Sequence, residues 1–462
     1  MSSPEVSRFD AVVIGAGASG TLVAAHLIGN DAFPLRVALV EPRAAMAEGV
    51  AYSTRCGEHL LNVRAAGMSA LDDSPGDFVR FLRTLPEYAA EDPAALGARF
   101  MPRRVYARYL ADLLDSRPGQ ARLHRIAGAA EDVMPVAGGF EVALASGERL
   151  QARTVVLATG NRPARLPRLD DATGAGAAAI EAWDYPAVAA IAPDADVCIL
   201  GAGLSMVDVV LTLRANGHRG RITSLSRRGL LPLPHAAPAP PAEFDVAGLL
   251  AMGLADRVRA VRALAAREEA QGRPWQGALD ALRPQVQALW TRLDADDQRR
   301  FLRHVVRHWD VHRHRIAPEI ARRLDEATAS GQLQRLAGRL LAIGPGPRME
   351  IAWRPRGGTD TARFEADVLV NALGMDPRID GGSGLLARLG ERGLLRPGPH
   401  RIGAATAGEG VPLDADGRPV DGLWTLGALR VGDLWESIAM PELRGQAQRV
   451  AAAVRAHLGA AG

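Results

Sequence analysis

The sequence contains no lysine, so all 55 of its Lys or Arg residues are arginine. Schiff-base catalysis, a pyridoxal phosphate site and a P-loop each require a lysine amine, and the sequence therefore excludes all three. Cysteine is nearly absent as well. The two cysteines, Cys56 and Cys198, are far apart in the chain and provide neither a disulfide framework nor a Cys-x-x-Cys redox pair.

Long apolar runs and long basic runs are also missing. No stretch of about 18 apolar residues occurs, and residues 1–8 lack the apolar core of a secretion signal. The formal net charge is only +3, without a run of interleaved basic and aromatic residues. We therefore expect a cytoplasmic protein with no membrane or nucleic-acid partner. Its 462 residues, 48% of them hydrophobic, allow two or three domains with sizeable cores.

A glycine-rich turn near the amino terminus is the strongest positive signal. The apolar run 10–14 leads into Gly15-x-Gly17-x-x-Gly20, which also contains Ser19, and a helical stretch and a second apolar run follow. Glu41 ends that run, 26 residues after Gly15. In such a strand-turn-helix-strand unit the glycines let a pyrophosphate approach the backbone, and the acid binds ribose hydroxyls. These residues predict a dinucleotide site.

The same pattern recurs in the middle of the chain, where an apolar strand precedes a turn that contains Gly201, Gly203 and Ser205. Arg227, followed by Arg228, lies 26 residues after the first glycine of this turn, in the position that Glu41 has in the first unit. Guanidinium groups suit a 2′-phosphate rather than a free hydroxyl, so the second site is predicted to bind an NADP-like dinucleotide. Met206 replaces the third glycine, which we expect to loosen the packing of the helix on the strand.

The remaining elements indicate how the two units are connected. Residues 154–160 form an apolar strand that should return to the first sheet, and residues 366–374 echo it at the end of the second unit. Helical spacing from about 242 to 330 predicts a small helical insertion. We expect an α/β protein with two Rossmann-like, doubly wound domains. The second domain (166–375) is inserted in the first (1–165 and 376–462).

Polar residues that flank these elements are further candidates for binding. Thr159 and Gly160 close a predicted strand beside the first nucleotide. The polar stretch 44–68, which includes Asn62, either runs along a cofactor or forms a surface connection. The candidates for orienting a substrate are Asn62, Arg64, Arg104, Tyr106 and Trp435. An ion pair for the arginines, or a place in the core for the tryptophan, is the ordinary alternative.

Three histidines, His304, His308 and His312, recur every four residues and would share one helical face. This spacing occurs in zinc sites. However, arginines such as Arg303 and Arg307 surround the histidines with positive charge, and a carboxylate at H-E-x-x-H spacing is missing. We therefore expect no metal. A basic face that receives a cofactor phosphate or an anionic substrate, and a solvated surface, both stay open.

Together these motifs resemble a group of two-dinucleotide flavoproteins whose characterised members are similar to FAD-dependent urate hydroxylase and nitrosuccinate synthase. The resemblance covers essentially the whole chain and is carried by residues 14–20, 59–63, 201–208, 225–229, 309–315, 434–437 and 441–444. It implies FAD in the first site, with Glu41 on the adenosine ribose, and NADPH in the second, with Arg227 or Arg228 at the phosphate. Flavoproteins of this type often have a Gly-Asp pair near the ribityl chain. The candidates for this position near the ribityl chain are Gly432 with Asp433 or, alternatively, Gly427.

The activity implied by the resemblance is that of a single-component monooxygenase. NADPH would reduce FAD, O2 would add to give a C4a-hydroperoxide, and a small nitrogen-rich substrate would take one oxygen. That substrate is either a urate-like ring or an amine. One alternative is an NADPH-dependent flavin reductase or dehydrogenase without oxygenation. Another is a non-catalytic flavin sensor, which the second nucleotide site disfavours because a sensor has little need for a hydride donor. Assembly into a homo-oligomer stays open.

Overall fold

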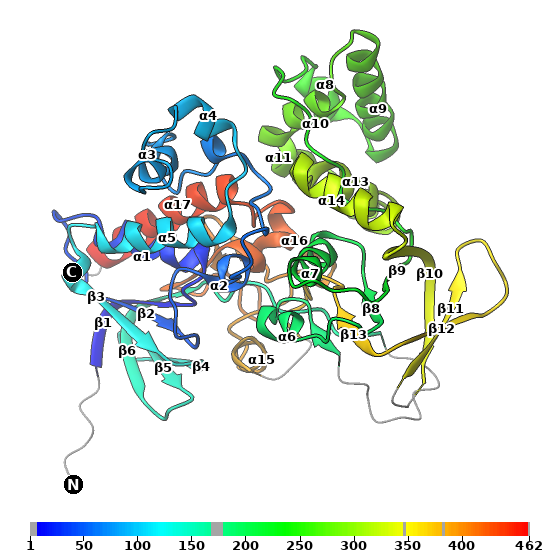
Figure 1. Cartoon of the computed structure of the whole chain (residues 1–462). Coiled ribbons are helices and arrows are strands. Elements are labelled where there is room, and N and C mark those ends of the chain that lie inside the picture. Colours follow the sequence, from blue (N-terminus) through cyan, green and yellow to red (C-terminus); the bar gives the residue numbers. More distant parts are fainter. Residues whose placement is uncertain (1–6, 168–178, 345–347, 381–383, 461–462) are drawn as a thin grey trace. The chain divides into compact units, whose positions relative to one another are not determined.

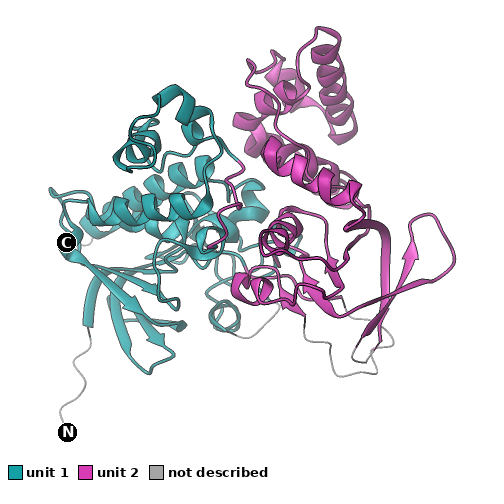
Figure 2. Cartoon of the chain, viewed as in Figure 1, with its two compact units in different colours: residues 1–54, 63–161, 377–462 teal, residues 55–62, 162–376 magenta. Residues whose placement is uncertain are grey.

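The computed structural model describes residues 7–167, 179–344, 348–380 and 384–460. The chain forms two compact units (Figure 2): unit 1 comprises residues 1–54, 63–161 and 377–462, and unit 2 comprises residues 55–62 and 162–376. The second unit is thus inserted in the sequence of the first. None of the described helices is long and apolar enough to cross a membrane.

Unit 1 is built on a seven-stranded sheet with the order β3-β2-β1-β6-β5-β4, in which β16 also pairs with β6. The parallel strands are β1 (Ser7–Ile14), β2 (Val37–Glu41), β3 (Leu123–Ala127), β6 (Arg149–Leu157) and β16 (Leu423–Thr425). The antiparallel strands β4 (Ala130–Val136) and β5 (Gly139–Leu144) extend the sheet from the first half of β6. β1 and β2 are continuously apolar near their carboxyl ends because both faces of a parallel sheet are covered.

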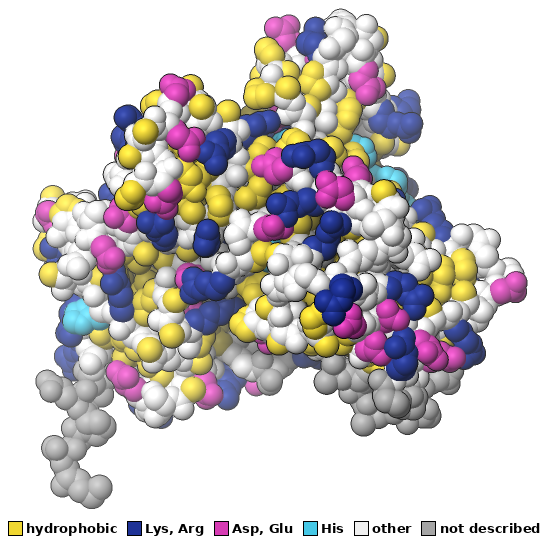
Figure 3. All heavy atoms as spheres, in the orientation of Figure 1, with side chains coloured by type: hydrophobic (Ala, Val, Ile, Leu, Met, Phe, Trp, Pro, Cys, Tyr) yellow, Lys and Arg dark blue, Asp and Glu magenta, His cyan; other side chains and the backbone are white. Residues whose placement is uncertain are grey.

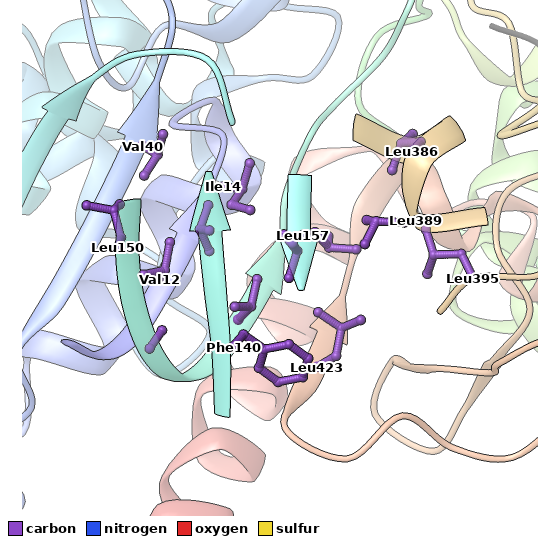
Figure 4. Packing of buried hydrophobic residues seen from close by; sticks show 14 of the residues in the cluster. Val12, Ile14, Val40, Phe140, Leu150, Leu157, Leu386, Leu389, Leu395 and Leu423 are labelled. Atoms are coloured by element: carbon purple, nitrogen blue, oxygen red, sulfur yellow. The ribbon is translucent and has the colours of Figure 1, made fainter. Parts of the chain in front are cut away.

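Helices α1 (Ala18–Ile28), α5 (Arg103–Asp115) and α17 (Met440–Ala460) lie side by side in unit 1 (Figure 1). The main core is one buried cluster that includes Val12, Ile14 and Leu157 of the sheet and Leu386 and Leu389 of α15 (Leu385–Glu391), all labelled in Figure 4. The shorter elements of unit 1 are α2 (Gly49–Tyr52), η1 (Ala65–Gly67), α3 (Asp77–Thr84), α4 (Pro93–Ala98), η2 (Gln120–Arg122), η5 (Pro399–Arg401), β14 (Thr406–Ala407), β15 (Val411–Pro412), η6 (Gly427–Arg430) and α16 (Val431–Leu434).

Unit 2 repeats this design with the strand order β12-β11-β10-β9-β8-β13-β7. The parallel strands are β7 (Ile180–Glu181), β8 (Val197–Leu200), β9 (Ile222–Ser226), β10 (Leu333–Ile343) and β13 (Val368–Asn371). The antiparallel strands β11 (Met349–Pro355) and β12 (Ala362–Ala366) extend the sheet beyond β10. Helices α6 (Tyr185–Ala189) and α7 (Leu204–Ala215) belong to this unit. The predicted pair of doubly wound α/β units is confirmed.

A helical insertion separates β9 from β10. It contains α8 (Val246–Ala251), α9 (Leu254–Ala270), α10 (Gln276–Leu282), η3 (Arg283–Gln285), α11 (Val286–Thr291), α12 (Ala295–Arg300), the π-helical turn η4 (Phe301–Val305), α13 (Val306–Arg313) and α14 (Pro318–Ala329). Leu264, Leu279 and Leu282 form a small core here, against which Trp309 packs. The insertion therefore has apolar packing of its own.

Residues 55–62 belong to unit 2, whereas we expected them in the first domain. His59 is fully buried, and its Nε2 lies 2.9 Å from the carbonyl oxygen of Asp208 and 3.0 Å from Oγ1 of Thr212, both on α7. The imidazole ring also contacts Tyr185, with 5.5 Å between the ring centroids. The sequence of this polar segment has no periodicity that would indicate which helix buries the histidine.

Two candidate dinucleotide sites

The first glycine-rich turn follows β1 and makes backbone contacts that only glycine permits. Gly15 has φ +103°, and a Cβ there would lie 2.3 Å from the carbonyl oxygen of Ala158, just after β6. A Cβ at Gly20 would lie 1.8 Å from the carbonyl oxygen of Gly15. Gly17 is the N-cap of α1, and the backbone of Gly49 packs directly on it. The first N–H groups of a helix have no intrahelical partner, and a glycine turn at this end of α1 lets a phosphate approach them.

Glu41 ends β2 and is buried beside this turn. Its Oε2 accepts a hydrogen bond of 2.8 Å from the N–H of Ala16, and its Oε1 accepts one of 3.2 Å from the N–H of Arg43. Each carboxylate oxygen can still accept a second hydrogen bond. The carboxylate is thus held in place with acceptor capacity left for ribose hydroxyls.

The end of β6 contributes an unsatisfied polar atom to the same region. Oγ1 of Thr159 is buried and has no hydrogen-bond partner among the described residues. A buried hydroxyl without a partner costs about 1–3 kcal/mol, which a bound ligand would offset. The next residue, Gly160, has φ +68°. The glycine turn, Glu41 and Thr159 together fit an FAD molecule.

The carboxyl-terminal segment packs against the first turn through Gly427. This residue has φ +68°, and a Cβ there would lie 2.9 Å from Oγ of Ser19 on α1. The N–H of Gly427 donates to Oε1 of Gln446 at 3.2 Å, and Nε2 of Gln446 donates to the carbonyl of Ser437 at 2.9 Å. Gln446 is fully buried on α17, in a face otherwise formed by apolar residues. Gln446 was not among the residues predicted from the sequence, although a glutamine in an apolar helix face indicates a buried polar contact.

The other candidate, the pair Gly432 and Asp433, contacts Ile402 and Thr406 instead of the first glycine-rich turn. The Asp433 carboxylate accepts hydrogen bonds from the N–H (2.9 Å) and Oγ1 (2.5 Å) of Thr406. Burial raises the pKa of Asp433, although the bonds from Thr406 and the charge of Arg430 act in the opposite direction. A Cβ at Gly432 would lie 2.0 Å from the carbonyl oxygen of Ile402. The contacts therefore favour Gly427 as the glycine next to the nucleotide turn.

The candidates for orienting a substrate lie on several elements, and only Arg104 and Tyr106 share one, helix α5. Tyr106 needs correction, because it is fully buried and its hydroxyl donates to the carbonyl of Met68 at 2.8 Å, so it belongs to the core. Arg104 is exposed in the first turn of α5. Trp435, which follows α16, has φ +63°, an unusual value for a bulky residue and a form of strain that functional sites often contain.

Arg64 and Asn62, the other two candidates, already have partners. Nη1 of Arg64 donates to the carbonyl of Ala98 at 2.6 Å, and its guanidinium lies 4.7 Å from the centre of the Phe100 ring. The carbonyl oxygen of Asn62 lies 3.0 Å from Nε2 of His235, within unit 2. Asn62 thus belongs to unit 2, whereas Arg64, Arg104, Tyr106 and Trp435 belong to unit 1, so neither unit contains all five candidates.

The second glycine-rich turn repeats the geometry of the first. Gly201 has φ +121°, and a Cβ there would lie 2.2 Å from the carbonyl oxygen of Ala372, as at Gly15. Gly203 is the N-cap of α7 and has open space around it. Oγ of Ser205 accepts a hydrogen bond of 3.0 Å from Nε1 of Trp183. Met206, in place of the third glycine, is fully buried, so its side chain packs in the interior of unit 2.

Arg227 and Arg228 follow β9 and form no ion pair with any carboxylate of the described residues. Nη1 and Nη2 of Arg228 lie 3.3 and 3.5 Å from the carbonyl oxygens of His304 and Arg303. Partial burial lowers the pKa of Arg227, and the nearby charges of Arg307 and Arg228 lower it further. This cluster of positive charge favours an anionic ligand.

Many arginines elsewhere in the described residues have acidic partners. Figure 3 shows basic and acidic side chains interspersed over the visible face. Arg219 pairs with Asp194 at 2.6 Å, and Arg348 pairs with Asp196 at 2.8 Å. Neither Arg227 nor Arg228 forms such a pair with the described residues, and the same is true of a few other arginines, such as Arg257, whose guanidinium donates to the carbonyl of Leu250 at 2.8 Å. The part of the chain that the structure describes contains no group of three or more His, Cys, Asp or Glu side chains suited to a metal.

Comparisons with known proteins agree with this geometry. Residues 12–162 match a family model described as FAD-NAD(P)-binding. The reduced form of ornithine hydroxylase from Pseudomonas aeruginosa matches with a TM-score of 0.68 at 16% identity, over 97% of this chain and 99% of that chain. L-lysine 6-monooxygenase from Pseudomonas syringae matches with a TM-score of 0.64 at 16% identity, over 97% and 99% of the two chains.

A third solved structure is an ornithine N-hydroxylase from Kutzneria sp. 744, solved with reduced FAD, NADP+ and L-ornithine. It matches with a TM-score of 0.63 at 15% identity, over 97% of this chain and 99% of that chain. No curated protein sequence matches the chain. Residues 12–162 thus match an FAD-NAD(P)-binding family, and the chain has the fold of these solved enzymes. The predicted cofactor class and fold are confirmed.

Proposed function

We propose that this protein is an FAD-dependent, NADPH-using monooxygenase that transfers one oxygen atom from O2 to the nitrogen of a small amine. The observation that carries the proposal is the opposite chemistry at two equivalent positions. Glu41 closes the first glycine turn with a carboxylate, and Arg227 closes the second with a guanidinium that forms no ion pair with the described residues. A carboxylate suits the ribose hydroxyls of FAD, and a guanidinium suits the 2′-phosphate of NADPH.

The proposed substrate class rests on the fold and on the sequence motifs. The two matched enzymes named for ornithine and the one named for lysine all act on small amines. The motifs that resemble urate hydroxylase make a urate-like ring the other nitrogen-rich candidate. Both belong to one reaction class, in which the protein orients a small substrate and excludes water while the flavin, when bound, carries electrons from NADPH to O2.

The residues divide into two binding groups in this proposal. The start of α1, Glu41 and the Thr159 hydroxyl bind FAD, and the start of α7 with Arg227 binds NADPH. A disulfide reductase is disfavoured because neither cysteine readily forms the thiolate that attacks a disulfide. Burial raises the pKa of Cys56, and it raises the pKa of the buried Cys198 to about 12. The alternative is a flavin reductase without oxygenation, and the experiment must distinguish it from the monooxygenase.

The test measures NADPH oxidation, O2 uptake and product mass with ornithine, lysine, aspartate and urate. Uptake of O2 that depends on one substrate, together with a product heavier by one oxygen atom, supports the proposal. Anaerobic turnover with another electron acceptor and no oxygenated product would support the reductase instead.

The double variant Arg227→Ala with Arg228→Ala tests the choice of dinucleotide. We expect the KM for NADPH to rise about tenfold or more, because charge-assisted contacts worth about 1.5–3 kcal/mol are lost. The flavin absorbance at about 450 nm and the rate with NADH should not change. The control is Arg299→Ala with Arg300→Ala, an adjacent and exposed arginine pair on α12. An equal loss with NADH would show that the arginines do not recognise the phosphate.

A further inference from the structure

The π-helical turn η4 interrupts the helical insertion between α12 and α13. In a π-turn the backbone hydrogen bonds run from i to i+5 instead of from i to i+4, and such turns are frequent at functional sites. The carbonyl oxygens of Arg303 and His304, both within η4, are the groups that face the guanidinium of Arg228. Arg228 is therefore held by neutral acceptors, which fix its orientation and leave its positive charge available.

The helix that follows η4 adds another guanidinium to this place. Arg307 lies in the first turn of α13, and it is close enough to Arg227 to lower the pKa of that side chain. Its ion-pair partner is Asp310, at 2.8 Å on the same helix, and the Arg307 side chain is 55% exposed. The guanidinium groups of Arg227, Arg228 and Arg307, from two separate segments of unit 2, thus lie near one another, and Asp310 pairs with Arg307.

Such a grouping is unfavourable without an anion, because like charges at short range repel one another. The charge of Arg228 also lowers the pKa of His308, after the larger effect of burial. The positive field therefore extends along α13 as well as along the end of β9. The sequence left open whether this helix face serves a phosphate or only solvent, and the contacts of Arg228 favour the phosphate.

We infer that the helical insertion forms one wall of the phosphate site in unit 2, in which η4 orients Arg228 and Arg307 binds the 2′-phosphate of the nicotinamide dinucleotide together with Arg227. This inference rests on the proposed use of NADPH. It assigns specificity for the phosphorylated dinucleotide to the insertion as well as to the Rossmann strand.

The experiment compares Arg307→Gln with Arg299→Gln in the FAD-loaded, full-length protein. Arg299 is the matched control, because it is an exposed arginine paired with Asp296 three residues away on α12 of the same insertion. Titration calorimetry would measure the Kd for NADP+, NAD+ and adenosine 2′,5′-bisphosphate. Arg307→Gln should weaken NADP+ and the bisphosphate about tenfold, the loss expected for one charge-assisted contact, and leave NAD+ unchanged. Arg299→Gln should bind all three ligands like the wild type.

A second variant is expected to raise the affinity for NADP+ instead of lowering it. Asp310→Asn removes the acid that competes for Arg307, so NADP+ binding should tighten about threefold while NAD+ binding stays constant. A folding defect would not produce a gain in affinity, so this result would support the inference even if Arg307→Gln folds poorly.

Two other results would count against these claims, and they differ. If Arg307→Gln and Asp310→Asn bind NADP+ like the wild type while Arg227→Gln loses affinity, the inference about the insertion is wrong and the proposed function stands. If Arg227→Gln also binds NADP+ normally, and NADP+ and NAD+ bind equally well to the wild type, both the inference and the proposed use of NADPH are wrong.

Discussion

Gly20 and Met206 occupy equivalent positions in the two glycine-rich turns and show how local backbone geometry decides which residue is allowed. At Gly20 the carbonyl of Gly15 occupies the place of a Cβ. In unit 2 the corresponding carbonyl, that of Gly201, accepts a hydrogen bond of 2.9 Å from Oγ of Ser224, and the methionine packs in the interior. The same motif therefore tolerates a large third residue in one unit and excludes even a methyl group in the other.

This contrast makes a prediction for Gly20→Ala. Alanine normally stabilises a helix relative to glycine, but here its methyl group would lie 1.8 Å from a backbone oxygen. We expect the free energy of unfolding to fall by about 1–3 kcal/mol, as for an overpacked core, and FAD binding to weaken. Urea unfolding and bound flavin content would measure both effects. Gly459→Ala, at an open position of α17, is the control and should not destabilise the protein.

Spacing along the chain was enough to find the residues that end β2 and β9. Glu41 and the Arg227 position follow from counting 26 residues after each first glycine, because a strand-turn-helix-strand unit has a narrow range of lengths. Tyr106 shows where such reasoning fails. Its place beside a predicted cofactor segment did not reveal that the phenol faces the core, because burial depends on which elements pack around α5.

At the scale of elements, α17 connects the carboxyl-terminal segment to the first nucleotide turn through one buried amide. Gln446→Met should leave the N–H of Gly427 and the carbonyl of Ser437 without partners, at a cost of about 1–3 kcal/mol. Because Gly427 contacts Ser19 on α1, we also expect weaker retention of FAD. Dialysis followed by flavin absorbance would measure that retention, and urea unfolding would measure stability.

The control for this variant is Gln448→Met, an exposed position two residues further along α17. It should change stability by less than about 0.5 kcal/mol. If Gln446→Met lowers stability but leaves the affinity for FAD intact, the Gly427 segment supports the fold without shaping the cofactor site.

The elements that the sequence did not reveal are those set by contacts distant in the chain. Helical spacing predicted the insertion from about residue 242 to 330, which the structure contains as the series of helices from α8 to α14. By contrast, η4 has the sequence of an ordinary amphipathic helix, and its π geometry has no signature in residue type. Residues 55–62 read as a polar loop, and only the burial of His59 against α7 shows where they belong.

At the scale of the whole molecule, the two units are variations of one design with separate interiors. Gly15 and Ala158 in unit 1 have the same relation as Gly201 and Ala372 in unit 2. Each sheet also has a core formed by residues of its own unit. Units with their own cores generally unfold as separate cooperative blocks. The two cofactors should therefore stabilise different parts of the protein.

Differential scanning calorimetry tests this separation. We expect two unfolding transitions, one that rises with FAD and one that rises with NADP+. At a ligand concentration of 100 Kd, each ligand should add about 2.7 kcal/mol to the unit that binds it. Glu41→Gln should abolish only the shift caused by FAD, because the new amide would place a donor against the N–H of Ala16 or Arg43. Arg227→Ala should reduce only the shift caused by NADP+, to about 1.4 kcal/mol at the same concentration for a tenfold rise in Kd. A single transition that responds equally to both ligands in both variants would show that the units unfold together and that neither residue discriminates between the dinucleotides.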